Sequence, residues 1–445
     1  MDSPYPLRPI SESEFPAFYR VIEQAFNATY PLEPELEHDR PIFEFDRTLA
    51  AFDGTHIVGT ALAFTMPITV PGGALTAAGV TAVSVLPSHR RRGILSSLMR
   101  RQLADIRDRG EAVAALFASE GGIYGRYGYG VATTELALTI KRGDGVVAPA
   151  AAAAGNGPAA GNGPAAGNGP AGNGPAGGTG RALRLRGAEP SDAVPEMSRV
   201  YDAVRGGRPG MPARDRRWWN YYLWDPEHRR EGFSRVLAVI AEDDTGVRGY
   251  ALFSAKPDWD EHEIPVGVLK VWDLMASDPA AWTALWNDLL TRDLIGEVRA
   301  RTRPADEPLL HLLADPRRAR PLLSDGLWIR LVSVPGALTQ RAYSSPVDVV
   351  IEVSDDLFAE NAGRWRLRAP GPAEHAGPAV VTCERTSAPA DLALPVRALG
   401  AAYLGGTRLA ALAGAGLVAE IRPGSVAALS TAMSCDPAPW CPATY

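Results

Sequence analysis

Three consecutive arginines, Arg90, Arg91 and Arg92, stand directly before Gly93, where an amphipathic helical pattern begins. The start of a helix presents unpaired backbone N–H groups and a partial positive charge. A glycine lets an anion approach the backbone closely, and guanidinium groups add charge-assisted hydrogen bonds. The pattern therefore predicts a site for a diphosphate, with Ile94 beside it. An exposed basic turn is the alternative interpretation.

The strand before this turn ends in Val83, Ser84 and Val85 and is stopped by Pro87. A bulge or splay near residues 82–85 would leave backbone amides and carbonyls free, so that a linear ligand with amides of its own could pair with them as an added strand. Coenzyme A combines a diphosphate with a pantetheine arm that carries two amides. The two neighbouring features together predict a site for this ligand.

Helix and strand patterns alternate around the motif over the first 147 residues. Ser11 and Glu14 form a capping-box pattern at the start of the first helix, and Asp53-Gly54 marks a hairpin turn. Gly110 is the expected C-cap of the arginine-led helix. The expected elements are a helix over 11–26, two strands within 47–70, a strand over 75–87, a helix over 93–109, and strands over 112–119 and 131–140.

The chain of 445 residues is too long for one ordinary core, and a prior of about 150 residues per domain suggests about three domains. The sequence GNGP occurs four times within residues 148–180. That composition has almost nothing to bury, so it predicts a disordered linker. We therefore expect domains over residues 1–147, 181–332 and 333–445.

The second expected domain resembles a variant copy of the first, because residues 181–207 repeat the order of strand, turn and helix. Its strand-to-helix connection, residues 275–282, lacks arginines, which predicts that this copy has lost the anion site. The aromatic cluster over residues 218–224 is interpreted as core packing on a helix, with a ligand cage as the alternative. Residues 333–445 predict a smaller α+β unit.

Composition limits the class of protein. The formal net charge of −6 argues against nucleic acid as a partner, and no apolar run approaches the ~20 residues of a membrane span. The N-terminal residues lack the features of a signal peptide, which predicts a cytoplasmic protein. Cys383, Cys435 and Cys441 are expected to be free thiols, although Cys435 and Cys441 are close enough for a disulfide. No motif predicts a metal site.

Two longer stretches carry a family resemblance. "VTAVSVLPSHRRRGIL", followed by "ALFASEGGIYGRYGYGVAT", resembles the N-terminal domain of the Eis-type N-acetyltransferases of the GNAT superfamily. The resemblance continues through residues 308–338 and 401–408. The superfamily pattern Q/R-x-x-G-x-G/A is met from Arg90 to Gly93, with Leu95 in place of the last small residue. The implied fold is α/β and α+β, with tandem GNAT-like domains followed by a sterol-carrier-like C-terminal domain.

The same resemblance implies the roles of individual residues. Acetyl-CoA would be the cosubstrate, bound along the strand end and the arginine turn described above, with no metal. Tyr124 matches the family's general acid, and the terminal carboxylate of Tyr445 matches its general base. Ser119 and Glu120 would flank the site. The alternatives are a packed aromatic side chain for Tyr124 and a frayed chain end for Tyr445.

The reaction implied is direct transfer of an acetyl group to a primary amine of a polycationic acceptor such as an aminoglycoside. Glu33, Glu35, Glu37 and Asp39 are expected to supply part of an acidic pocket, with a solvated charged loop as the alternative. Polyamines and peptide or protein lysines are alternative acceptors. A non-catalytic lipid or ligand carrier that uses the C-terminal domain is an alternative of a different class. Members of the family form trimers of dimers, which implies a homohexamer.

Overall fold

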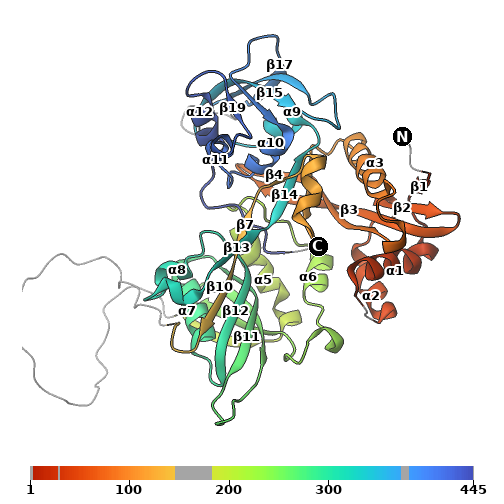
Figure 1. The fold of residues 1–445 in the computed structure, drawn as a ribbon. Helices are drawn as coiled ribbons and strands as arrows, with labels where there is room; N and C mark the ends of the chain where they lie inside the picture. Colours follow the sequence, from red (N-terminus) through yellow and green to blue (C-terminus); the bar gives the residue numbers. More distant parts are fainter. Residues whose placement is uncertain (1–3, 29–30, 146–182, 372–379, 444–445) are drawn as a thin grey trace, which may run out of the picture.

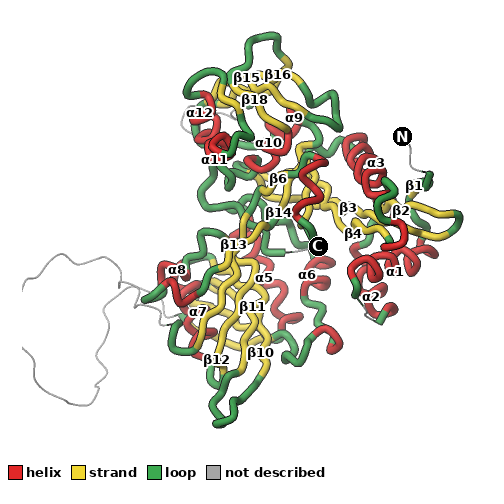
Figure 2. Tube along the Cα trace, viewed as in Figure 1, coloured by secondary structure: helices red, strands yellow, loops and turns green. Residues whose placement is uncertain are grey.

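The computed structural model of the chain describes residues 4–28, 31–145, 183–371 and 380–443. The linker predicted over residues 148–180 lies outside these described residues. The described part contains sheets of seven, seven and five strands. Figure 1 shows these sheets in three bodies that meet near the centre of the molecule, and Figure 2 marks their strands in yellow.

The first sheet has the strand order β1-β2-β3-β4-β5-β14-β6. In that order the strands are β1 (Leu7–Arg8), β2 (Thr48–Asp53), β3 (His56–Val70), β4 (Gly73–Val85), β5 (Val113–Phe117), β14 (Leu327–Leu331) and β6 (Gly130–Val131). Asp53 pairs with His56 across the turn between β2 and β3, which confirms the predicted hairpin. β4 is antiparallel to β3 and parallel to β5, so the arginine turn is the start of a crossover connection.

Helix α3 (Ile94–Asp108) forms that crossover and covers one face of the first sheet. The helix begins at Gly93 and is followed by Gly110 at a φ of 79°, as the sequence predicts. On the opposite face lies α1 (Phe15–Phe26). The predicted capping box is present on the 3-10 turn Glu12–Glu14 that leads into α1, where the backbone N–H of Ser11 donates to Glu14 at 2.8 Å. The buried stripe of α3 is Ile94, Leu98, Met99, Gln102, Leu103 and Ile106.

The second sheet has the order β13-β7-β12-β11-β10-β9-β8. Its strands are β13 (Leu322–Asp325), β7 (Thr134–Lys141), β12 (Ile295–Pro304), β11 (Gly267–Ala276), β10 (Gly246–Lys256), β9 (Leu237–Asp243) and β8 (Arg184–Ala188). Its helices are α5 (Pro190–Arg205), α6 (Arg216–Tyr222), α7 (Pro279–Thr291) and α8 (Leu309–Leu312). The element order repeats that of the first sheet. The aromatic cluster lies on and just after α6. Trp219 is 1% exposed, which confirms its interpretation as core, whereas the other aromatic side chains of the cluster are half-buried.

The N-terminus of α7 differs from that of α3 in one decisive respect. Asp278 caps α7 and accepts hydrogen bonds from the backbone N–H of Ala281 and from Nε of Arg248, both at 2.9 Å. A carboxylate therefore already occupies the place where a phosphate would bind. This geometry agrees with the prediction that the second copy has no anion site.

The first two sheets exchange strands. β7 follows β6 in the chain but lies between β13 and β12 of the second sheet, while β14 returns to the first sheet between β5 and β6. The sequence-based assignment of the strand at 131–140 to the first domain's sheet is therefore wrong. An alternating pattern identifies a strand but not its partner, because the partner is decided by contacts distant in sequence.

The third body is the α+β unit predicted at the C-terminus. Its sheet has the order β17-β16-β15-β18-β19. The strands are β17 (Thr382–Arg385), β16 (Gly363–Ala369), β15 (Val347–Ser354), β18 (Leu392–Pro395) and β19 (Ala419–Glu420), and the helices are α9 (Val334–Thr339), α10 (Val396–Ala402), α11 (Leu409–Gly414) and α12 (Ser425–Ala432). One continuous apolar cluster joins this unit to the face of the first sheet opposite α3, from Met66 and Ile329 to Leu399 and Tyr403.

Three properties of the described residues bear on the class of protein. Cys383, Cys435 and Cys441 are free thiols. No three histidine, cysteine, aspartate or glutamate side chains in the described ranges are grouped so that they could hold a metal ion. Within the same ranges, no helix combines the length and the apolar character that crossing a bilayer requires.

Candidate active site

A groove of about 580 Å³ runs from the start of α3 to the turn that carries Tyr124. It brings together nearly all the residues that the sequence singles out for ligand binding. They are Val83, Ser84, Val85, Arg90, Arg91, Gly93, Ile94, Ser119, Glu120 and Tyr124. Arg92 does not line the groove, because its Nη1 donates to the hydroxyl of Tyr5 at 2.9 Å.

Gly93 supplies the backbone shape that an anion site needs. Its φ of 83° lies in the left-handed region, where side chains with a Cβ are strained, and Arg91 also has a positive φ of 64°. The chain turns sharply at these two residues, and the first turn of α3, with the unpaired N–H groups of a helix start, lines the groove beside Arg90 and Arg91. The turn can therefore hold a diphosphate through both backbone dipoles and guanidinium groups.

The predicted bulge in β4 is present. Thr60 pairs with Ser84 but Leu62 pairs with Thr81, so β4 contains one extra residue at Ala82–Val83. Ala82 has a φ of 52°, and its carbonyl accepts a hydrogen bond from Oγ1 of Thr60 at 2.7 Å. The bulge re-aims the end of β4 towards the groove.

β4 and β5 also splay apart below the groove. The two strands pair in parallel at only two positions, Ala78 with Ala114 and Gly79 with Ala115. In the described part of the chain, the end of β4 at residues 83–85 therefore has no strand partner on the β5 side. An extended ligand with amides can pair along this edge, which is the arrangement that the sequence predicts.

Tyr124 ends helix α4 (Gly121–Tyr124) and is 5% exposed. Burial raises the pKa of Tyr124 above its usual value, and a hydrogen bond with Ser119 acts in the opposite direction. A buried phenol that stays protonated can donate a proton to a leaving group in the groove. The hydroxyl of Tyr127, which also lines the groove, lies 3.1 Å from Oγ of Ser96.

The end of the described chain is docked. Trp440, Cys441 and Ala443 are 2%, 1% and 4% exposed, and Nε1 of Trp440 donates to the carbonyl of Thr302 at 2.9 Å. Tyr445 lies outside the described residues, so the role of its carboxylate stays a prediction.

Sequence comparisons agree with this fold. Residues 6–132 and residues 210–331 each match the family described as an acetyltransferase (GNAT) domain, and residues 334–442 match the sterol carrier protein domain. An uncharacterised N-acetyltransferase of Streptomyces avermitilis is 42% identical over 437 residues, which are 98% of either chain. N-acetyltransferase Eis of Mycobacterium tuberculosis is 34% identical over 367 residues, which are 81% of this chain and 79% of that protein. The chain belongs to the Eis-type GNAT N-acetyltransferases.

Solved structures of other acetyltransferases are similar to this chain over nearly its whole length. Eis1 from Mycobacterium abscessus has a TM-score of 0.76 at 30% identity and covers 99% of this chain and 100% of its own. A GCN5-related N-acetyltransferase from Anabaena variabilis has a TM-score of 0.78 at 16% identity, with the same coverage, and shares the fold. The protein is an acyltransferase with two GNAT domains followed by a sterol carrier protein domain, as the sequence predicts.

The acidic segment of this Eis-type enzyme is a helix, α2 (Leu32–Asp39), and Glu35 in this helix is not available to the acidic pocket that the sequence suggests. The Glu35 side chain is fully buried and accepts hydrogen bonds from Arg229, from Nε2 of His228 at 3.0 Å and from Tyr19 at 3.2 Å. Its charge is already compensated by the second GNAT domain, so it cannot attract an amine. The expectation for Glu35 is therefore wrong, because its partner lies 194 residues away in sequence.

Asp39, on the same helix, gives a pH-dependent prediction. Burial, followed by the negative charge of Glu35, raises the pKa of Asp39 from 3.8 to about 7, with Arg229 acting against them. The folded protein thus disfavours ionised Asp39, and this residue's contribution to stability falls as the pH rises from about 4 through 7. Asp39→Asn should therefore stabilise the enzyme by about 1–3 kcal/mol more at pH 8 than at pH 5 in denaturant titrations.

Glu37→Gln is the matched control for that prediction, because Glu37 lies exposed on the same helix. It should change the free energy of unfolding equally little at both pH values. A gain for Asp39→Asn that is the same at pH 5 and pH 8 would contradict the assigned pKa shift.

Sequence reasoning missed several groove residues. Phe26 fits the apolar stripe of α1, yet it is 49% exposed and lines the groove beside Ala25. Arg126 and His89 also line it. Asn27 could have indicated the position of Phe26, because asparagine tolerates the left-handed region and often ends a helix. In the structure Asn27 ends α1 at a φ of 54°, so Phe26 is the last residue of that helix.

Proposed function

We propose that the enzyme transfers the acetyl group of acetyl-CoA directly to a primary amine of a polycationic small molecule, with aminoglycosides as the leading class. The single observation that carries this proposal is the groove itself. One continuous surface joins an anion cradle at Gly93, an unpaired strand edge at Val83–Val85 and a buried tyrosine at position 124. Their order matches the order of diphosphate, pantetheine and thioester along acetyl-CoA.

In this proposal Arg90 and Arg91 hold the diphosphate, and the bulged end of β4 pairs with the pantetheine amides. A backbone N–H near Val83 polarises the thioester carbonyl. Fixing both reactants in line supplies several kcal/mol of the rate enhancement. Ser119 and Glu120 shape the wall beside the acyl group.

The chemistry balances without a covalent enzyme intermediate. The amine loses a proton to the α-carboxylate of Tyr445, its lone pair attacks the carbonyl carbon, and the C–S bond of the resulting tetrahedral adduct breaks. Tyr124 then gives its proton to the departing thiolate, and the second proton of the attacking nitrogen restores the phenol of Tyr124. A phenol with a typical pKa of about 10 is a weaker acid than a thiol with a pKa of about 8.5, and burial raises the pKa of Tyr124 further, so proton transfer from Tyr124 to the thiolate is uphill until the nitrogen's proton returns to the phenolate. An α-carboxyl with an ordinary pKa of about 3.5 is a weak base, so it works only when burial raises that pKa.

The acceptor class rests on the family and on charge. Glu33 and Glu37 remain exposed on α2, and the chain is acidic overall. A second acidic pair, Glu135 and Asp325, lies beside Trp328, whose Nε1 donates to Asp325 at 2.7 Å and whose ring packs near Gly121 at the start of the tyrosine turn. Burial, followed by the charge of Asp325, raises the pKa of Glu135 to about 7. A cationic amine near this pair would favour its ionised form.

A thiol-release assay tests the proposal. Purified enzyme with acetyl-CoA is given aminoglycosides, polyamines and lysine peptides in parallel. Release of coenzyme A with an aminoglycoside, at kcat/KM above that for the other two classes, is the expected result. A higher kcat/KM with lysine peptides or polyamines would make those compounds the acceptor class instead. No release of coenzyme A with any of the three classes would overturn the proposal.

Calorimetry with acetyl-CoA separates the enzyme from a non-catalytic carrier. Arg90→Ala combined with Arg91→Ala is expected to weaken binding by about 30–100-fold, because two charge-assisted contacts to phosphate are lost. Arg100→Ala and Arg101→Ala, which remove two arginines from α3 outside the groove lining, are the matched control and should leave the dissociation constant within twofold. A carrier that uses only the third domain would show no binding that depends on Arg90 and Arg91.

Three further expectations belong to this proposal. A homohexamer, a cytoplasmic location and the absence of a nucleic-acid partner follow from the family resemblance and from composition. Analytical ultracentrifugation of the purified enzyme tests the first, and a hexamer that dissociates into stable dimers would fit a trimer of dimers.

A further inference from the structure

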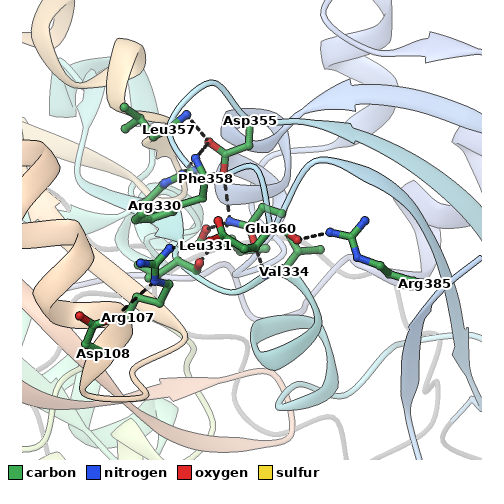
Figure 3. A network of polar contacts seen from close by, with 12 residues as sticks. Arg107, Asp108, Arg330, Leu331, Val334, Asp355, Leu357, Phe358, Glu360 and Arg385 are labelled. Carbon is green, nitrogen blue, oxygen red and sulfur yellow. Dashed lines mark hydrogen bonds and ion pairs between the residues drawn. The ribbon is translucent and has the colours of Figure 1, made fainter. Parts of the chain in front are cut away.

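Arg330 of β14 is completely buried, and its charge is balanced from another domain. Nη2 of Arg330 donates to both carboxylate oxygens of Asp355, at 2.6 and 2.8 Å (Figure 3). Asp355 follows β15 in the sterol carrier protein domain. Its carboxylate also accepts from the backbone N–H of Leu357 and Phe358, at 3.0 and 3.2 Å, and from Nδ2 of Asn361 at 2.9 Å. The third domain thus fixes the guanidinium group of Arg330 in one place.

The other side of this guanidinium faces the turn that carries the active-site tyrosine. Gly128 closes the turn Gly125–Tyr127 with a φ of 84°, and a Cβ at position 128 would overlap Nη1 and Cζ of Arg330. Nη1 and Nε of Arg330 and the hydroxyl of Tyr129 are buried without a hydrogen-bond partner in the described part of the chain. The guanidinium is therefore packed directly beneath the turn rather than used in a second ion pair.

Tyr129 links the guanidinium to Tyr124. The rings of Tyr124 and Tyr129 meet edge to face with centroids 6.1 Å apart, and Tyr129 is 1% exposed. Burial raises the pKa of Tyr129, and the positive charge of Arg330 acts against this rise. A shift of the guanidinium would move Tyr129 and, through it, the ring of Tyr124.

The third domain also holds the far end of the same stretch. A Cβ at Gly130 would overlap the backbone of α10 at Arg397 and Ala401, and Oγ1 of Thr407 donates to the carbonyl of Val131 at 2.9 Å. The segment from Tyr124 to Val131 is therefore held at two points, by Arg330 at Gly128 and by α10 at Gly130. We call these two contacts the clamp. Only glycine fits at both close approaches.

We infer that Arg330, held by Asp355, is a positioning residue that fixes the Tyr124 hydroxyl over the acyl end of the groove. The third domain then takes part in catalysis by setting the geometry of the general acid, in addition to any role of Tyr445. The inference rests on the proposed function for the role of Tyr124, but the clamp itself is a property of the fold.

The test removes the pair without leaving a buried charge. Arg330→Met combined with Asp355→Asn is expected to lower kcat about 10–50-fold while the KM for acetyl-CoA stays within twofold, since the anion cradle is untouched. The high-pH limb of the kcat profile should move to lower pH, because a displaced Tyr124 meets water. Arg330→Lys, which keeps a positive charge for Asp355 but removes the planar guanidinium beneath Gly128, should lower kcat about 3–10-fold and serves if the double variant does not fold.

A matched control exists in the first domain. Arg47 and Glu111 form an ion pair that is nearly as buried and lies outside the groove lining, with Nη1 donating to Oε1 at 2.8 Å and Nη2 to Oε2 at 2.6 Å. Arg47→Met combined with Glu111→Gln should keep kcat within twofold and leave the pH profile unchanged. Equal losses of kcat in the two double variants would overturn the inference, because they would reflect a general loss of stability.

Hydrogen exchange gives a readout that needs no activity. Amides of residues 124–131 should exchange at least tenfold faster in the Arg330/Asp355 variant than in the Arg47/Glu111 variant, while those at the start of α3 stay the same. Unchanged protection of residues 124–131 would overturn the clamp even if the enzyme acetylates amines. If the Arg330/Asp355 variant exchanges faster but the wild-type enzyme releases no coenzyme A, the clamp is supported and the proposed function is contradicted.

Discussion

Replacement of Tyr124 by phenylalanine is expected to lower kcat for acetyl transfer by about 10²–10³-fold, the range typical of a lost general acid. The ring remains, so the packing against Tyr129 and the walls of the groove are preserved. The KM for acetyl-CoA should stay within about threefold, because the phenol acts on the leaving thiolate and not on the bound diphosphate. Steady-state kinetics with a saturating amine measures both quantities.

The pH dependence of kcat gives a second test of the role of Tyr124. Burial raises the pKa of Tyr124, so the phenol stays protonated beyond the pH at which an exposed tyrosine would lose its proton. The wild-type kcat should therefore show no loss from this group below about pH 10. The deficit of Tyr124→Phe should be nearly constant between pH 7 and pH 9.

Two other tyrosines provide controls for this prediction. Tyr403→Phe removes a buried hydroxyl that donates to the carbonyl of Ala337 at 3.1 Å in the third domain, so it measures the stability cost of such a change alone. Tyr127→Phe removes the other groove-lining phenol, which bonds Ser96. A large loss of kcat in Tyr127→Phe with little loss in Tyr124→Phe would show that Tyr127, and not Tyr124, is the general acid.

The sequence predicts the anion cradle well because its signals are local. An arginine run, a glycine at a helix start and a strand stopped by proline are all read within about 15 residues. The bulge at Ala82–Val83 and the left-handed Gly93 appear where this reasoning places them. The family resemblance then adds Tyr124, which periodicity alone leaves as one of three similar tyrosines.

Features decided by distant contacts could not be predicted in the same way. β7 and β14 each read as ordinary strands, but their exchange between sheets depends on pairing across about 190 residues. Glu35 reads as a surface charge until Arg229 is brought beside it. Arg330, in the stretch "WIRLV", gives no sign of being completely buried, because only the third domain supplies the carboxylate that makes this burial possible.

Extension of the chain by four residues, Gly-Ser-Gly-Ser, beyond Tyr445 is expected to lower kcat by about 10²-fold at pH 7. The extension does not change Trp440, Cys441 or Ala443, which stay buried, but the α-carboxylate is then carried by the added serine four residues beyond Tyr445. An ammonium group with a pKa of about 9–10 needs a base to lose its proton at pH 7 and needs much less help at pH 9.5. The deficit should therefore shrink towards tenfold or less as the pH rises, whereas a general loss of folding would persist at every pH.

The same four residues placed before Met1 are the matched control, and kcat should then stay within twofold. Acetyl-CoA binding, measured by calorimetry, should be unchanged in both extended chains, because the cradle at Arg90 and Arg91 lies on α3 and its preceding turn. Unchanged turnover in the C-terminally extended enzyme would eliminate the terminal carboxylate as the base. The proton would then have to leave the amine through another base.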